Sequence, residues 1–71
     1  MNNDELIQIA EDRAHKLETA AAHIHKAQAI VIAIRADAEL IRLGIGNREH
    51  LKEVIARADF VLNGLAKGHG Q

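Results

Sequence analysis

Apolar residues recur along the first two thirds of the chain with a period of seven residues. With Ala10 taken as an a position, the a series is Ala10, Leu17, Ile24, Val31, Ala38 and Ile45, and the d series is Leu6, Arg13, Ala20, Ala27, Ile34 and Ile41. Only Arg13 in these two series is polar. A second apolar stripe follows, made of Leu51, Val54, Ile55, Ala58, Val61, Leu62 and Leu65. Both patterns are typical of helices that pack against other helices.

The residues that can begin or end a helix are few. Asn2 and Glu5 have the spacing of a capping box at the start of the first stripe. No Gly or Pro occurs between there and Gly44, which is a natural residue to end a helix, and Asn47 is a good N-cap for the next one. We therefore predict an all-α single domain over residues 1–67. It has a long helix over about 3–43, a turn at 44–47, a short helix over about 48–67 and a flexible tail at 68–71.

One segment fits the helical pattern less well. Residues 29–34 are six consecutive apolar residues, which alone could form a buried strand. Ala-rich sequence continues on both sides and no turn residue bounds the run, so we predict a helix. A helix that is apolar all round is buried on more than one face. We expect one side of it to meet the short helix and another side to meet a second chain.

The lengths of the two helices also indicate self-association. The long helix would span ~60 Å and the short one ~27 Å, so the hairpin leaves the stripe from Leu6 to Leu17 uncovered. The sequence thus predicts a homodimer, or a higher even oligomer, that resembles a four-helix bundle. Its predicted interface is Leu6, Ala10, Leu17, Ile24, Val31 and Ile34. The alternative is a break near residues 19–23 that gives a three-helix monomer, although no helix-breaking residue lies there.

Charge is distributed unevenly along a chain whose net charge is −1. Residues 1–18 hold five acidic and two basic side chains, whereas residues 19–71 hold five acidic and seven basic ones. An antiparallel pairing of two long helices would set the acidic end of one beside the basic half of the other. The near-neutral total does not favour nucleic acid as the partner.

Side chains for catalysis or metal binding are scarce. Cys, Ser and Tyr are absent and Thr19 is the only hydroxyl residue, so we expect no enzyme activity and no catalytic residue. Five histidines are present, namely His15, His23, His25, His50 and His69. Their spacing does not bring three ligands together, so we expect no metal and no cofactor. A histidine at a helical interface could titrate near neutral pH, which leaves a pH-sensitive dimer as an open hypothesis.

The expected location is the cytoplasm. The chain has no Cys for a disulfide, 27% of its residues are charged, and its N-terminus is acidic where a signal peptide is basic. No apolar run approaches the length of a membrane span.

A helical bundle without a nucleophile acts through its surface. We predict a partner-binding patch in the half of the bundle nearest the turn, made of Arg35, Arg42, Arg48, Lys52 and Phe60. The predicted function is that of a non-enzymatic homo-oligomeric interaction protein, a small regulator or inhibitor that binds a host or cellular protein.

In architecture alone, the predicted hairpin dimer is similar to the Rop-type plasmid regulators, which bind RNA as four-helix bundles. This resemblance implies the alternative function of a nucleic-acid-binding regulator. The outline also resembles the small all-helical proteins that phages and mobile elements use to occlude host factors, which implies a protein partner. A structural coiled-coil subunit is the third interpretation.

Overall fold

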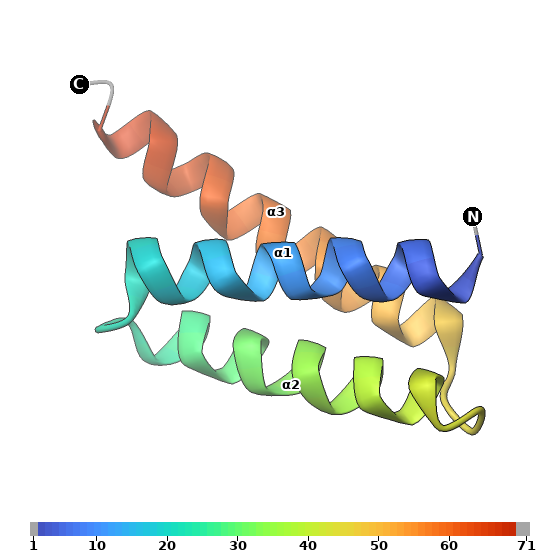
Figure 1. Cartoon of the computed structure of the whole chain (residues 1–71). Coiled ribbons are helices and arrows are strands. Elements are labelled where there is room, and N and C mark those ends of the chain that lie inside the picture. Colours follow the sequence, from blue (N-terminus) through green and yellow to red (C-terminus); the bar gives the residue numbers. More distant parts are fainter. Residues whose placement is uncertain (1, 70–71) are drawn as a thin grey trace.

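Three helices make up the fold. The computed structural model describes residues 2–69, which form α1 (Asn3–Ala21), α2 (His25–Arg42) and α3 (Arg48–His69) and contain no strand. Helices α1 and α2 lie side by side and antiparallel, while α3 crosses them and its C-terminal half projects away from the pair (Figure 1). The all-α prediction is therefore confirmed. Helix α3 extends to His69, and residues 70 and 71 of the predicted tail lie outside the described residues.

The prediction of one long helix over 3–43 is wrong. Helix α1 ends at Ala21, and α2 begins after Ile24, whose backbone is extended with φ −98° and ψ 118°. The N–H of Ile24 donates to the carbonyl of Ala21 at 3.0 Å, and the side-chain amide of Gln28 donates to the carbonyl of Ala22. The longest dimension of the chain is 42 Å, whereas an unbroken helix over 3–43 would need ~60 Å. The three-helix alternative replaces the helix–turn–helix hairpin.

The buried residues occupy different heptad positions on the two sides of the break. After Leu6 at d and Ile7 at e, the buried stripe of α1 runs through a and e positions, namely Ala10, Ala14, Leu17 and Ala21. In α2 it runs through a and d positions, namely Ala27, Val31, Ile34 and Ala38. In a continuous helix these stripes would face directions about 50° apart, at about 100° per residue. The turn at 22–24 lets both stripes face one core, and no Gly or Pro is needed because other donors reach the end of α1.

The capping predictions are confirmed. The Asn2 side chain accepts from the Glu5 N–H at 2.8 Å, and the Glu5 side chain accepts from the Asn2 N–H at 3.5 Å, which completes the capping box. At the start of α3, the Asn47 Oδ1 atom accepts from the N–H groups of Glu49 at 2.9 Å and His50 at 3.2 Å. These side chains satisfy N–H groups that have no partner within the helix.

Gly44 ends α2 as the sequence predicts. Its φ is +82°, its N–H donates to the Ile41 carbonyl at 2.9 Å, and the next N–H, of Ile45, donates to the Leu40 carbonyl at 3.0 Å. These two bonds are those of a Schellman motif, in which the residue after the C-cap adopts the left-handed conformation. The chain then reverses before α3.

The core is made entirely of aliphatic side chains in the described part of the chain, and no polar or charged residue is buried there. Five of the six residues predicted to form an oligomer interface belong to this core, namely Leu6, Ala10, Leu17, Val31 and Ile34, and Ile24 packs against it while half-buried. The premise that the stripe from Leu6 to Leu17 lacks cover is therefore wrong. Because the chain reverses at 22–24, α2 and α3 both pack on α1 and cover that stripe.

The apolar run at 29–34 is helical, as predicted, and lies within α2. Ile30, Val31 and Ile34 are buried, and Ile32 is exposed. The run is apolar on two sides because α2 packs against both α1 and α3. Burial of this segment on two faces therefore requires no second chain.

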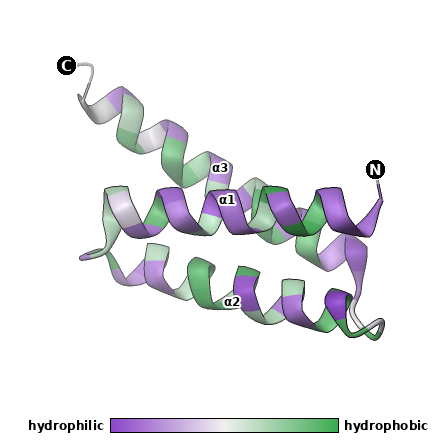
Figure 2. Cartoon of the chain, viewed as in Figure 1, coloured by the Kyte–Doolittle hydropathy of each residue, from purple (hydrophilic) through white to green (hydrophobic). Residues whose placement is uncertain are grey.

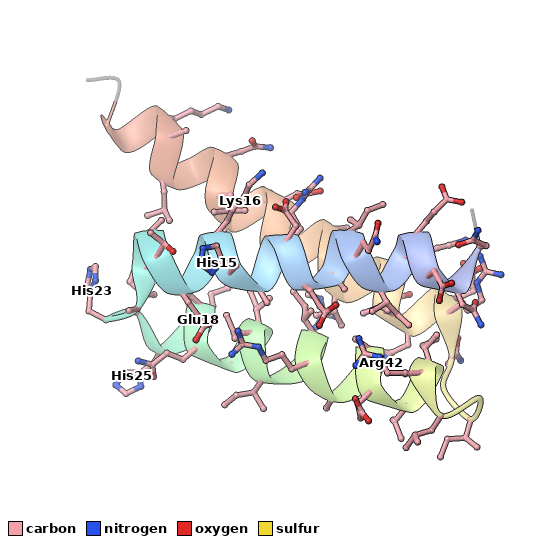
Figure 3. All side chains as sticks on the ribbon, in the orientation of Figure 1. His15, Lys16, Glu18, His23, His25 and Arg42 are labelled. Atoms are coloured by element: carbon pink, nitrogen blue, oxygen red, sulfur yellow. The ribbon has the colours of Figure 1, made fainter. Side chains whose placement is uncertain are left out.

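The acidic and basic segments pair within one chain. Glu18 on α1 binds Arg35 on α2, and one heptad away Glu11 lies 3.3 Å from Arg42. Figure 3 shows Glu18 pointing from α1 toward α2 and Arg42 pointing from α2 toward α1. We expected acidic and basic segments to pair between antiparallel helices of two chains. The ion pairs instead join two antiparallel helices of one chain.

Helix α3 is covered unevenly along its length. Leu51, Val54, Ile55 and Ala58 are buried, whereas Val61, Leu62 and Leu65 are only half-buried. Figure 2 shows hydrophobic and hydrophilic residues alternating along all three helices, including the projecting half of α3. This half therefore carries apolar side chains with little cover from the rest of the chain.

Candidate functional site

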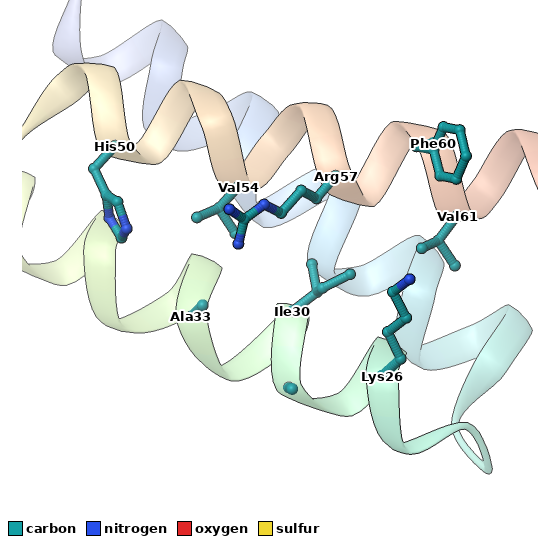
Figure 4. A pocket seen from close by; sticks show the side chains of 9 residues that line it. Lys26, Ile30, Ala33, His50, Val54, Arg57, Phe60 and Val61 are labelled. Carbon is teal, nitrogen blue, oxygen red and sulfur yellow. The ribbon is translucent and has the colours of Figure 1, made fainter.

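A groove of about 520 Å³ lies between α2 and α3 (Figure 4). We call it the α2–α3 groove, and it is lined by Lys26, Ala29, Ile30, Ala33, His50, Val54, Arg57, Phe60 and Val61. Its floor is apolar, and charged or aromatic side chains stand along its sides. It is open to solvent rather than enclosed.

Helical spacing explains why these residues line one hollow. Apart from the adjacent pairs Ala29–Ile30 and Phe60–Val61, the lining residues of each helix lie three or four positions apart, so those of α2 lie on one side of that helix and those of α3 on one side of theirs. Ala29 and Ala33 are one helical turn apart on the α2 wall, and their methyl groups leave room that larger side chains would fill. The groove therefore follows from small residues on α2 opposite Val54 and Val61 on α3.

The walls of the groove carry unpaired positive charge. Lys26 from α2 and Arg57 from α3 extend toward the groove from opposite sides (Figure 4). Neither forms an ion pair in the part of the chain that the structure describes. Five other cations do form ion pairs with carboxylates, namely Arg13, Lys16, Arg35, Arg42 and Lys52.

One end of the groove is tied together by His50 and Asp37. The Nδ1 atom of His50 on α3 lies 2.6 Å from the Oδ2 atom of Asp37 on α2. That oxygen is buried, and no hydrogen bond with favourable angles reaches it. The contact joins the two walls of the groove beside the turn at 43–47.

Phe60 is the predicted partner-binding residue that the structure places at this groove. Its side chain is 76% exposed, which is unusual for the only aromatic residue of a chain. Exposed aromatic side chains beside an apolar hollow are typical anchors of protein interfaces. Phe60 and Arg57 therefore give the groove the residue types that such interfaces favour.

The other four predicted residues lie elsewhere. Arg35 and Arg42 point toward α1 and bind its carboxylates, and Lys52 lies 3.2 Å from Glu49. Arg48 opens α3 and has a partner of its own. The side chains expected to form one basic band are thus engaged in separate interactions.

These ion pairs shift several pKa values. The hydrogen bond from Arg35 holds the pKa of Glu18 below its usual value of 4.5, and the one from Lys16 lowers the pKa of Asp12. The pKa of Arg42 is raised, chiefly by Glu39 and then by Glu11. Arg13 binds Asp59 at 2.7 Å between α1 and α3, and this contact raises its pKa. The only polar d position is thus explained by a bond between helices.

A second hollow, of about 410 Å³, lies between α1 and α2 and includes Ile32 in its lining. Its cation, Arg35, is already bound to Glu18. This hollow therefore lacks the unpaired charge that distinguishes the α2–α3 groove.

The histidines do not come together. His15, His23 and His25 are exposed, and His23 and His25 point outward at the end of the bundle (Figure 3). Among the described residues, no three His, Cys, Asp or Glu side chains are placed to hold a metal ion. The His69 side chain lies outside the described part. No helix within residues 2–69 is long and apolar enough to cross a membrane.

Sequence reasoning missed Lys26, Arg57 and the two alanines of the α2 wall. Lys26 and Arg57 are visible in the sequence as two of seven cations after residue 18, but spacing alone does not say which of them lack partners. The one local signal is Ala29 and Ala33, since two small residues a turn apart leave a hollow beside a neighbouring helix.

Comparisons with known proteins give no relative from which to transfer a function. No model of a known family matches the chain, and neither does any curated protein or solved structure.

Proposed function

We propose that this protein is a non-enzymatic helical interaction protein that binds an amphipathic helix of another protein in the α2–α3 groove. The observation that carries the proposal is the open apolar groove with Lys26 and Arg57 on opposite walls and Phe60 exposed beside them. Binding there would occlude the partner's helix, which makes the protein a regulator or inhibitor. A cytoplasmic location is part of the same proposal.

The shape and charge of the groove favour a helix as its occupant. Small-molecule sites enclose most of their ligand, whereas this groove is open along its length. Helix-in-groove recognition uses apolar anchors at i, i+3, i+4 and i+7. With a cation on each wall, the matching helix has Asp or Glu on both sides of its apolar stripe.

Self-association, which the sequence predicts, is part of this proposal, but it has to use residues other than those first assigned to it. The residues first assigned to the interface lie in the core, so an oligomer has to use side chains that remain exposed. Exposed and half-buried side chains gather on α3 from Phe60 onward, next to the groove.

A display selection tests the function with no target chosen in advance. The full chain is immobilised, and helical peptides with randomised surface positions are selected for binding. We expect enrichment of peptides with an apolar stripe flanked by Asp or Glu. We also expect Arg57→Glu and Phe60→Asp to weaken their binding at least tenfold, or about 1.4 kcal/mol.

Lys52→Glu is the matched control, because it makes the same charge change on α3 outside the groove. It should leave peptide affinity within about twofold. Selected peptides that bind Phe60→Asp as tightly as the original chain would show that the groove is not the site. A selection that enriches no sequence would also count against the proposal.

A further inference from the structure

We infer that the helix best matched to the α2–α3 groove is α3 of a second copy of this chain, antiparallel to the first across a two-fold axis near Ile55. The inference rests on the proposed function, because it takes the same groove as a site that receives a helix. It names the occupant and the residues that meet. It also predicts a dimer whose interface differs from the one expected from the heptad pattern.

One face of α3 beside the groove is exposed along its length. We call it the outer stripe, and it consists of His50, Glu53, Arg57, Phe60 and Gly64. These residues are spaced three and four apart, so they share one face of the helix. Every member is exposed, and no side-chain or backbone atom lies within 4 Å of the place where a Cβ on Gly64 would stand. The stripe has the spacing of a helix-packing seam. Apart from the contact of His50 with Asp37 on α2, no ion pair or side-chain hydrogen bond joins it to another helix in the described part of the chain.

The outer stripes of two copies of α3 have complementary charges when the two helices run antiparallel. In an antiparallel pair centred near Ile55, each residue faces the one equally far on the other side of the centre. Glu53 then faces Arg57 of the second copy, and His50 faces Phe60 of the second copy. Neither Glu53 nor Arg57 forms an ion pair in the described part of this chain. Two-fold symmetry makes each contact twice and closes the assembly as a dimer.

The charges of the groove favour the antiparallel orientation. Glu49 and Glu53 lie one turn apart near the start of α3, whereas Lys26 lies beside Val61 at the other end of the groove, and Arg57 extends from α3 toward Val54 between them (Figure 4). An antiparallel second helix brings its acidic half to this cationic end of the groove. Glu49 is 80% exposed in its pair with Lys52, so it remains accessible to a second copy. A parallel helix would instead set Glu53 against Glu53.

The contact between the two α3 helices would bury apolar surface that is exposed to solvent in the monomer. Phe60 is 76% exposed, and Val61 next to it is only half-buried. The C-terminal half of α3, which begins near Phe60, projects beyond α1 and α2 (Figure 1). Burial of aromatic and aliphatic surface, together with four matched charges, supplies the attraction.

Charge exchange across the dimer provides the test. Sedimentation of the full chain over a range of concentrations should show a dimer with a micromolar Kd. Glu53→Arg and Arg57→Glu should each raise that Kd about tenfold, since each places like charges in contact twice. The double variant Glu53→Arg/Arg57→Glu should restore the original Kd to within a few-fold.

A mixture of the two single variants is the sharper measurement. One protomer then carries two arginines at these positions and the other two glutamates, so a heterodimer should form more tightly than either homodimer. An effect of either substitution on the stability of its own helix would not favour the heterodimer over the homodimers. Lys52→Glu, on α3 but off the outer stripe, is the control and should leave the dimer Kd unchanged. Circular dichroism confirms that each variant keeps its helices.

A wild-type chain that stays monomeric at millimolar concentration would overturn the inference. A dimer that forms with no heterodimer preference in the mixture would do the same. In either case, peptide binding that still depends on Phe60 would leave the proposed function standing. If peptide binding ignores Phe60 while the charge exchange works, the dimer is supported and the partner-binding proposal fails.

Discussion

Gly44 and Gly64 both have open space where a Cβ would stand but differ in backbone conformation, and each tests one physical effect at a single residue. Gly44 has a φ of +82° in the Schellman motif that ends α2. Gly64 lies inside α3, where a Cβ would meet open space. The first glycine permits a left-handed backbone, and the second only weakens a helix.

Gly44→Val should destabilise the protein by about 1–2 kcal/mol, because a branched side chain is strained in the left-handed region. The free energy of unfolding, measured by urea denaturation followed by circular dichroism, is the readout. An unchanged midpoint would mean that the turn at 43–47 can end α2 in another conformation.

Gly64→Ala should stabilise the monomer by about 0.5–1 kcal/mol, since alanine loses less backbone entropy in a helix and meets no neighbour here. The same denaturation at low protein concentration measures it. A loss of stability would show that the position is not a regular, uncrowded helix interior.

At the scale of the elements, ion pairs from α1 hold the other two helices in register. Glu18 and Glu11 bind Arg35 and Arg42 on α2, and Arg13 binds Asp59 on α3. The partners lie on antiparallel faces one heptad apart, so a slip of α1 against α2 would break both α1–α2 pairs. These contacts favour one register, while the aliphatic core supplies most of the stability.

Lowering the pH should weaken the ion pair between Glu18 on α1 and Arg35 on α2. The bond from Arg35 sets the folded-state pKa of Glu18 below its usual 4.5, so this group contributes stability at higher pH. The contribution is lost as pH falls from about 4.5 through the lowered pKa. The thermal unfolding midpoint should therefore drop between about pH 5 and pH 3, and drop less in Glu18→Gln. Equal acid dependence of the two proteins would show that the pair contributes nothing measurable.

The molecule as a whole has a well-packed part and a weakly packed part, because α3 is buried unevenly along its length. Leu51 to Ala58 carry the buried face of α3 against the other helices, whereas from Val61 to Lys67 the side chains are at most half-buried. A chain of 71 residues has a small hydrophobic core. Local unfolding is therefore expected to begin where the fewest side chains are buried.

Amide hydrogen exchange should follow this division. At low protein concentration the amides of residues 62–67 should exchange faster than those of 51–58, as read by mass spectrometry or NMR. Raising the concentration should slow exchange around residues 57–64 if a second α3 docks there. Uniform protection along α3 in the monomer would contradict the uneven cover seen in the fold.

The sequence alone was sufficient where neighbours along the chain decide the structure. The capping box of Asn2 and Glu5, the left-handed Gly44 and the N-cap Asn47 were all predicted, because each acts on backbone groups within about three residues. The helical class followed from the period of the apolar residues. Phe60 was predicted to lie beside the apolar stripe of Leu51, Ala58 and Leu65, either filling the edge of the core or anchoring a partner, and the structure leaves it exposed.

Only the tertiary structure decided where the chain reverses and which charges stay unpaired. The break at 22–24 carries no Gly or Pro, and across it the stripe moves from a and e to a and d positions, a change that a heptad pattern accommodates. Arg35 and Arg42 meet carboxylates 17 and 31 residues away, whereas Lys26 and Arg57 meet none among the described residues. Such pairings depend on how the three helices pack in space. They cannot be predicted from the spacing of residues along the chain, because the partners are far apart in the sequence.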